Sequence, residues 1–194
     1  MRTALILLLL ASVGACSKRS ATDPVRAANP YRDAVRERVL PDGLVLEEID
    51  LNNDGRPEIF NYYREREGAP RLLVRKDVDF SRNGRIDARS WYNDAGVLEM
   101  EEFDGDFDGQ FDIWDYYQDV EGNGVPVRVA THRDTTFDGK PDTFIFYRDG
   151  RVVRKERDTN GDGIIDHWER FDSEGNVVRS GRDTNYDGSV DQRD

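Results

Sequence analysis

The sequence predicts an all-β protein in which short antiparallel hairpins follow one another along the chain as a meander. A nine-residue loop pattern, with Asp at position 1, Gly at position 6 and an acid at position 9, occurs six times. Aromatic-rich runs such as Ile59-Phe-Asn-Tyr-Tyr63 follow the loops, and each leads through a glycine-bearing turn into a β-branched run such as Val152-Val153. Aromatic and β-branched residues favour strands, so the order strand, turn, strand, loop is that of a hairpin repeat.

The loops carry oxygen-bearing side chains at alternate positions. They begin at residues 50, 79, 104, 134, 158 and 183, so the steps are 29, 25, 30, 24 and 25 residues. Oxygen ligands at positions 1, 3, 5 and 9, with glycine at the sharp turn, are the spacing by which one short loop wraps a calcium ion. We therefore expect calcium as the cofactor. The candidate metal ligands are Asp50, Asn52, Asp54, Glu58, Asp79, Ser81, Asn83, Asp87, Asp104, Asp106, Asp108, Asp112, Asp134, Thr136, Asp138, Asp142, Asp158, Asn160, Asp162, Asp166, Glu169, Asp183, Asn185, Asp187 and Asp191.

Two other interpretations of the loops stay open. Asp and Gly favour turns whether or not a metal is present. Turn chemistry alone does not explain acids that recur at fixed positions while position 2 varies freely. The stretch from Asp158 to Glu169 also fits the EF-hand consensus through position 12. Glycine turns soon after each loop leave too little room for flanking helices, so we expect a shorter ligand set closed at position 9.

Two loops resemble known calcium-binding repeats. The segment Asp50-Leu-Asn-Asn-Asp-Gly-Arg-Pro-Glu-Ile59 looks like the calcium loop of FG-GAP (integrin-type) repeats, and Asp104 to Asp112 is similar to thrombospondin type 3 loops. The turn-and-valine half of each unit is similar to Tyr-Asp-type repeats of secreted bacterial proteins. The FG-GAP resemblance implies propeller blades of four strands, more than one unit supplies. We expect the meander to coil or close into a solenoid-, barrel- or propeller-like body that hides its apolar face.

Aromatic side chains two and four residues past the acid at position 9 share one face of each strand, because strand side chains alternate with period two. We expect this aromatic ladder to form the core. The alternative is a set of sugar-stacking platforms on an open face. The ladder consists of Phe60, Tyr62, Trp91, Trp114, Tyr116, Phe144, Phe146 and Trp168.

The first residues have the features of an export signal. Residues 1–15 contain Arg2 followed by an apolar run, residues 4–11, that is too short to span a bilayer. The segment Val13-Gly-Ala-Cys16 resembles the lipobox of bacterial lipoproteins, which implies lipidation of Cys16, and Ser17 implies the outer membrane within that family. Residues 16–30 are polar and carry proline, as expected of a flexible tether, and residues 31–194 form one domain. Residues 31–40 fit either a short helix or a first strand.

Charge and residue types narrow the function. The chain has 40 acidic and 28 basic residues, and removing the signal with Arg2 takes the mature chain from −12 to −13, which six calcium ions would nearly balance. Nucleic acid is excluded as a partner for so acidic a chain. The two histidines, His132 and His167, lack the companions of a zinc site, and no nucleophile or phosphate-loop motif occurs. We expect a non-enzymatic envelope protein, held to the membrane by its lipid, whose partners are other envelope proteins or surface glycans. The alternative is a carbohydrate-binding or polysaccharide-processing surface protein.

Overall fold

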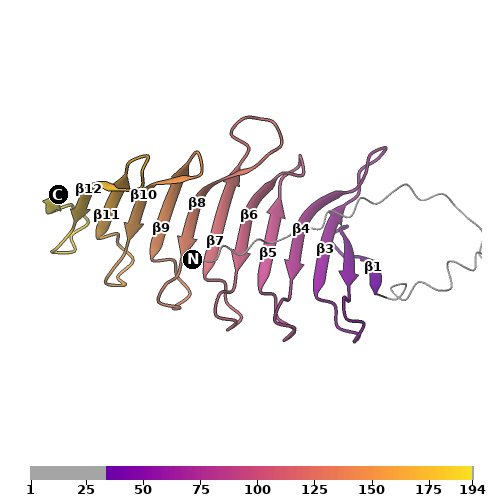
Figure 1. Cartoon of the computed structure of the whole chain (residues 1–194). Helices are drawn as coiled ribbons and strands as arrows, with labels where there is room; N and C mark the ends of the chain where they lie inside the picture. Colours follow the sequence, from indigo (N-terminus) through magenta and orange to yellow (C-terminus); the bar gives the residue numbers. More distant parts are fainter. Residues whose placement is uncertain (1–33, 194) are drawn as a thin grey trace, which may run out of the picture. The chain divides into compact units, whose positions relative to one another are not determined.

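The computed structural model describes residues 34–193, so the expected signal peptide, the tether and Cys16 lie outside the described residues. The described chain forms a single sheet of 13 strands in which every strand is antiparallel to its neighbours in sequence (Figure 1). The expected all-β antiparallel meander is confirmed. No helix that could cross a bilayer occurs between residues 34 and 193.

Each hairpin unit supplies two strands. For residues 31–40 the sequence left a short helix and a first strand as alternatives, and Val35–Val39 form a strand. The strands are β1 (Val35–Val39), β2 (Val45–Ile49), β3 (Ile59–Arg64), β4 (Leu72–Val78), β5 (Ala88–Tyr92), β6 (Leu98–Phe103), β7 (Ile113–Gln118), β8 (Val127–Arg133), β9 (Thr143–Arg148), β10 (Arg151–Arg157), β11 (His167–Phe171), β12 (Val177–Arg182) and β13 (Gln192–Arg193).

The sheet is open in the described residues. Its strand order runs from β1 to β13 without a crossover, and β1 and β13 each pair with one neighbour only. The barrel or propeller-like closure expected from the sequence is not formed by this part of the chain. Both edges carry features that discourage pairing with another chain, because β1 has the charged run Arg36-Glu37-Arg38 and β13 is only two residues long.

The aromatic ladder does lie on one face, as the strand register shows. Trp114 on β7 pairs with His132 on β8, which pairs in turn with Phe144 on β9, and the remaining ladder residues continue the same two rows. We call this side of the sheet the aromatic face. None of the eight ladder residues is buried, however; all are half-buried. The expectation that they form the core is wrong, because within residues 34–193 no second layer covers the sheet.

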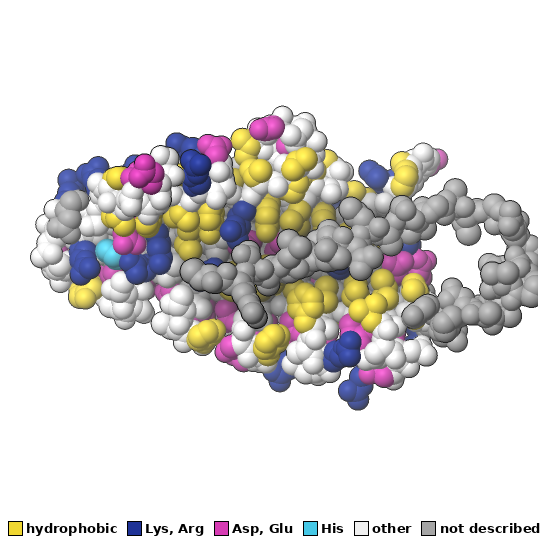
Figure 2. All heavy atoms as spheres, in the orientation of Figure 1, with side chains coloured by type: hydrophobic (Ala, Val, Ile, Leu, Met, Phe, Trp, Pro, Cys, Tyr) yellow, Lys and Arg dark blue, Asp and Glu magenta, His cyan; other side chains and the backbone are white. Residues whose placement is uncertain are grey.

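Little of the protein is a hydrophobic core in the usual sense. The buried hydrophobic residues in the described chain are Ala34, Val45, Leu46, Leu72 and Ala88, near the β1 end of the sheet. Figure 2 shows hydrophobic side chains gathered in separate patches over the strands of the visible face, with Lys, Arg, Asp and Glu between them. A single layer therefore relies on contacts along each face in place of contacts between layers.

Charged groups cover the aromatic rings on the aromatic face. The guanidinium of Arg75 lies 3.6 Å from the centroid of the Tyr62 ring and 5.4 Å from that of Trp91. Such cation–π contacts are worth about 0.5–1 kcal/mol at exposed sites. Asp77 is only 2% exposed, and its carboxylate forms ion pairs with Arg75 at 3.2 Å and with Arg89 at 3.0 Å. These pairs hold the arginines over the rings.

The opposite side, which we call the tyrosine face, carries the aromatic residues five positions past each acid. Tyr117 donates its hydroxyl to Glu101 at 2.8 Å, and its pKa is raised by burial and by that carboxylate. Thr131 is fully buried and donates a hydrogen bond to Asp115, which also accepts one from Arg128 at 3.1 Å. This face is therefore joined by polar networks that run across the strands. Its aromatic members are Tyr63, Tyr92, Tyr117, Tyr147 and Phe171.

The stability of the sheet is expected to fall in mild acid through His132. This ring lies 4.7 Å from the Tyr116 ring and 4.8 Å from that of Phe144, and burial lowers its pKa. The unfolded state then binds more protons below about pH 6.5, so the contribution of His132 to the free energy of unfolding is constant above that pH and decreases as the pH falls through it. Urea unfolding between pH 7.5 and 5 measures the slope. The variant His132→Phe keeps a ring and removes the charge, so its slope should be shallower; an unchanged slope would contradict this role.

Candidate metal centres in the Asp-Gly loops

The six loops all lie on the same side of the sheet, at one end of its strands. Each loop connects an even-numbered strand to the next odd-numbered strand, from β2–β3 to β12–β13. The hairpin turns, which connect odd-numbered to even-numbered strands, lie at the opposite ends of the strands (Figure 1). Because consecutive loops are separated by two strands, we expect a spacing of about 10 Å between neighbours. The meander therefore gathers the candidate ligands into one row.

The loops share one backbone conformation. Position 4 is left-handed in every loop, with φ between 59° and 65° at Asn53, Arg82, Phe107, Phe137 and Tyr186 and 79° at Gly161. The glycine at position 6 has φ between 85° and 96° in all six. Left-handed backbone is unfavourable for residues with a β-carbon, so the invariant glycine has a steric reason. The sequence pattern correctly identified this turn.

The aspartate at position 1 organises each loop. One of its carboxylate oxygens accepts the N–H of the position 6 glycine at 2.7–2.8 Å in all six loops. The other oxygen accepts an N–H from position 3, 4 or 5, as Asp104 does from Phe107 at 2.7 Å. Position 1 is buried in five loops and half-buried at Asp158.

The acid at position 9 closes the loop from the strand side. Its carboxylate accepts the N–H of position 2 at 2.7–2.9 Å in five loops. In the second loop Asp87 instead accepts the N–H of Ser81, at position 3, at 2.6 Å. Thr135, Thr159 and Thr184 add a hydroxyl donor at position 2. Five of the six acids at position 9 are buried, and Asp191 is exposed. Positions 1 and 9 thus place two carboxylates at the base of each loop.

The third loop brings three carboxylates together. Asp104, Asp106 and Asp108 have ligand oxygens that all lie within 4.8 Å of one another, and it is the one group of at least three acidic, His or Cys side chains so placed in residues 34–193. In three other loops the amide of an asparagine at position 3 donates to the acid at position 5, at 3.0 Å for Asn52 and Asp54. Those amides would have to turn their oxygen inward to bind a cation.

Two loop acids, Asp112 at position 9 of the third loop and Asp134 at position 1 of the fourth, have pKa values shifted in opposite directions. Burial raises the pKa of Asp112; a hydrogen bond from Gly105 opposes this, and the nearby charges of Asp106 and Asp104 raise it further. Burial would also raise the pKa of Asp134, at position 1 of the next loop, but donors including the backbone of Gly139 and Phe137 outweigh it and lower the pKa. The third loop therefore brings several negative charges close together, and its all-oxygen donor set suits a hard divalent cation.

Neighbouring loops are joined by the backbone. The N–H of position 1 in each loop after the first donates to the carbonyl of position 9 in the loop before it, as Asp104 does to Asp87 at 2.8 Å. In the second and third loops the residue at position 7 also reaches the next glycine: a β-carbon at Gly109 would lie 2.9 Å from the guanidinium of Arg85, and one at Gly139 would lie 3.4 Å from Gln110. Ordering of one loop is thereby linked to the order of the next.

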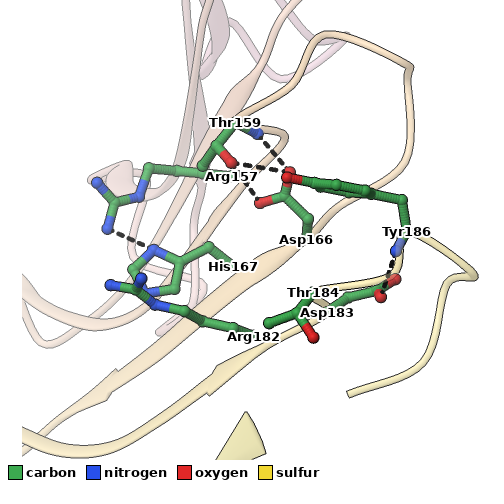
Figure 3. Close-up of a pocket in the computed structure, with 8 residues that line it drawn as sticks. All are labelled: Arg157, Thr159, Asp166, His167, Arg182, Asp183, Thr184 and Tyr186. Atoms are coloured by element: carbon green, nitrogen blue, oxygen red, sulfur yellow. Dashed lines mark hydrogen bonds between the residues drawn. The ribbon is translucent and has the colours of Figure 1, made fainter. Parts of the chain in front are cut away.

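Figure 3 shows the space between the last two loops. A hollow of about 350 Å³ separates Asp166 from Asp183, and Tyr186 extends from the sixth loop towards Thr159 of the fifth. The ring nitrogen Nδ1 of His167 accepts a hydrogen bond from Arg157 at 2.7 Å, and the pKa of His167 is lowered first by burial and then by the charge of Arg157. Both carboxylates point into their own loops, so each loop is a separate candidate site.

One predicted ligand is placed differently from the rest. Glu169, the position 12 candidate, lies on β11, where it accepts a hydrogen bond from Arg157 at 2.9 Å and pairs in register with Lys155. The structure does not direct it into the fifth loop. The second loop keeps the common arrangement at position 5, where Asn83 accepts the N–H of Arg85 at 2.7 Å, and its Ser81 donates to Asp79 and Asp87.

The loop backbone occurs a seventh time, at a place where the sequence pattern did not predict it. Asp119 lies between β7 and β8, at the strand ends opposite the six loops. It accepts hydrogen bonds from the N–H groups of Asn123 at 3.0 Å and Gly124 at 2.8 Å, and both Gly122 and Gly124 have positive φ. The signal was Asp119-Val-Glu-Gly-Asn-Gly124, which matches positions 1 to 6. It lacks an acid at position 9, where Val127 stands.

Apolar side chains at loop positions 2 and 4 were also overlooked. Position 4 carries Phe107 and Phe137, each 51% exposed, and Tyr186 at 49%; position 2 carries Leu51 at 56% and Phe80 at 61%. Their recurrence at fixed loop positions was the available signal. The row of six loops therefore exposes both acidic and apolar side chains.

The comparisons with known proteins name no family. No protein-family model matches the chain, and no curated protein sequence matches it. A solved structure, the crystal structure of accessory secretory protein 1,2 and 3 in Streptococcus pneumoniae, is similar at 16% identity over 69% of this chain and 20% of that chain, with a TM-score of 0.23. The chain thus spans about a fifth of the length of the protein it matches. This TM-score is too low to assign a shared fold.

Proposed function

We propose that the protein is a non-enzymatic, calcium-binding lipoprotein of the bacterial outer membrane, with a structural or adhesive role in the cell envelope or in a surface assembly. The observation that supports it most is the row of six loops with one backbone conformation and paired carboxylates at positions 1 and 9. A single-layer sheet with few buried hydrophobic residues has little else to fix its strands.

The ligands at the third loop would be Asp104, Asp106, Asp108 and Asp112, and the same positions would serve in the other loops. Bound calcium would neutralise carboxylates that otherwise repel one another. The surrounding N–H donors orient the acids at positions 1 and 9, leaving positions 3 and 5 at the solvent side. The role proposed for the metal is to hold the strands in register at the end that carries the loops.

Calcium affinity is expected to depend most on the third loop. Removing one of its close carboxylates, in Asp108→Ala, should lower the calcium-induced rise in melting temperature and the number of ions bound by calorimetry, and Asp162→Ala should act similarly in the fifth loop. Asn83→Ala is the matched control, because it lies at the same position of a loop with carboxylates only at positions 1 and 9. Equal responses of wild type, Asp108→Ala and Asp162→Ala would contradict the assignment.

Lipid attachment has its own test. Metabolic labelling with a palmitate analogue should mark the protein, and Cys16→Ser should abolish both the label and retention in the membrane fraction, because Cys16 is the one cysteine in the chain. The variant Ser17→Ala keeps the cysteine and serves as a control. Unlabelled wild-type protein in the membrane fraction would contradict lipidation.

A second candidate function, carbohydrate binding, is favoured by the half-buried rings of the aromatic face. Rings that pack against a second layer could not contact a ligand, whereas these remain accessible along the sheet. A glycan array in calcium, with Trp114→Ala and Trp168→Ala as variants, tests it: saturable binding lost in these variants with the fold intact would support it.

A further inference from the structure

Three arginines lie directly opposite one another on adjacent strands of the aromatic face. Arg154 on β10 pairs in register with Arg170 on β11, which pairs with Arg179 on β12. Side chains directly opposite on antiparallel strands have β-carbons about 5 Å apart, and like charges there are destabilising. The chain as a whole is acidic, with a net charge of −12, so a row of cations at this spacing is unexpected.

The row is poorly compensated within the protein. Arg154 contacts Glu156 at 3.4 Å and lies over the Phe146 ring at 3.8 Å. Arg170 and Arg179 are exposed and make no ion pair or ring contact with the rest of residues 34–193. The arginines of the β4–β5 region differ, because Arg75 and Arg89 both pair with Asp77.

The arginines surround an aromatic ring in a hollow. A cavity of about 230 Å³ is lined by Trp168 together with Arg154, Arg170, Arg179 and Arg193. Trp168 is half-buried, and its register partner on β12 is Gly181, which has no side chain to cover the ring. A β-carbon at Gly181 would lie 3.0 Å from Val190, so this position is shaped by the sixth loop.

The charge balance of the hollow is positive. The lining has four arginines and two glutamates, Glu156 and Glu169, which leaves a net charge of +2. Guanidinium groups bind carboxylates through two parallel hydrogen bonds, and an indole ring offers a flat apolar surface. A ligand that satisfies both is a small ring with C–H groups on one side and a carboxylate at its edge.

We propose that this hollow, the Trp168 site, binds a hexuronic acid unit of an acidic polysaccharide. The pyranose ring lies on Trp168, and its carboxylate is held by Arg170 and Arg179, whose mutual repulsion it relieves. The volume suits one sugar ring, and chain ends of the ligand leave along the open sheet. The inference rests on the second candidate function. It does not require the calcium loops to contact the sugar.

The test measures binding of trigalacturonate to the soluble mature protein by calorimetry in millimolar calcium and 0.15 M salt, with a neutral galactose trisaccharide as the control ligand. Saturable binding of the acidic trimer alone is expected. Arg170→Gln and Arg179→Gln should each weaken it about tenfold or more, as loss of a charged hydrogen-bond partner does. Arg36→Gln, an exposed arginine on the same face in β1, should leave the affinity unchanged.

Melting temperature supplies the second readout. Because Arg170 stands between two other cations, Arg170→Gln should leave the melting temperature the same or higher while binding is lost; a lower melting temperature with unchanged binding would give the arginine a structural role and overturn the proposal. Equal binding of the neutral trimer would retain carbohydrate binding but overturn the acidic specificity. Competition by inorganic phosphate at equal concentration would show a general anion site and also overturn it. Absence of binding to either trimer would overturn the site, whereas the second candidate function is tested separately by the glycan array.

Discussion

Replacing Asp104 by alanine is expected to lower the free energy of unfolding by about 2–4 kcal/mol even in chelator, because two backbone donors lose their acceptor at a part-buried site. Those donors are the N–H groups of Phe107 at 2.7 Å and Gly109 at 2.8 Å, and Asp104 itself is 4% exposed. Calcium should enlarge the deficit. A loop held at ten times its dissociation constant gains about 1.4 kcal/mol that the variant cannot recover.

Asp119→Ala is the matched control for this substitution. Asp119 accepts the same two kinds of backbone bond, from Asn123 and Gly124, in a loop without an acid at position 9. Its donors are exposed and can bond water, so the loss should be about 1 kcal/mol and the same with and without calcium. Urea unfolding of both variants in chelator and in calcium measures the two effects. Deficits of Asp104→Ala that do not grow with calcium would show that the third loop is an Asx turn only.

The strands and loops could be predicted because each is specified locally. Alternation of aromatic residues placed Trp114 and Phe144 on one face, and the Asp-to-Gly spacing placed the left-handed turns, both of which depend on a few neighbouring residues. Glycine at position 6 in every loop is required by φ near 90°, a condition visible in the sequence without knowledge of the tertiary structure.

The burial of the aromatic ladder could not be predicted in the same way. Alternation indicates which side chains share a face, but it does not indicate whether another layer covers that face. Here Phe60 and Trp168 are half-buried, and cations such as Arg75 contact the rings of the ladder. The clusters of Asp77 with Arg75 and Arg89 and of Thr131 with Asp115 depend on cross-strand register, which spacing within one strand does not reveal.

The seventh loop was missed for a different reason. The pattern required an acid at position 9, and Asp119 begins a loop whose position 9 is Val127. Backbone conformation depends on positions 1, 4, 5 and 6, whereas the proposed metal chemistry depends on position 9 as well. The structure separates these two requirements, and that separation makes Asp119 useful as a control.

The most direct test of the account compares the melting temperature and circular dichroism of the soluble mature protein in chelator with those in millimolar calcium. Carboxylates that repel one another in six loops should leave the chain folded but markedly less stable in chelator. Calcium should compact it and raise the melting temperature steadily with concentration, by on the order of 20 °C when all loops are filled to ten times their dissociation constants. Magnesium should act more weakly, since it gives up its water reluctantly. Identical spectra and identical melting temperatures in chelator and in millimolar calcium would show that the loops are ordinary turns and would contradict the central claim.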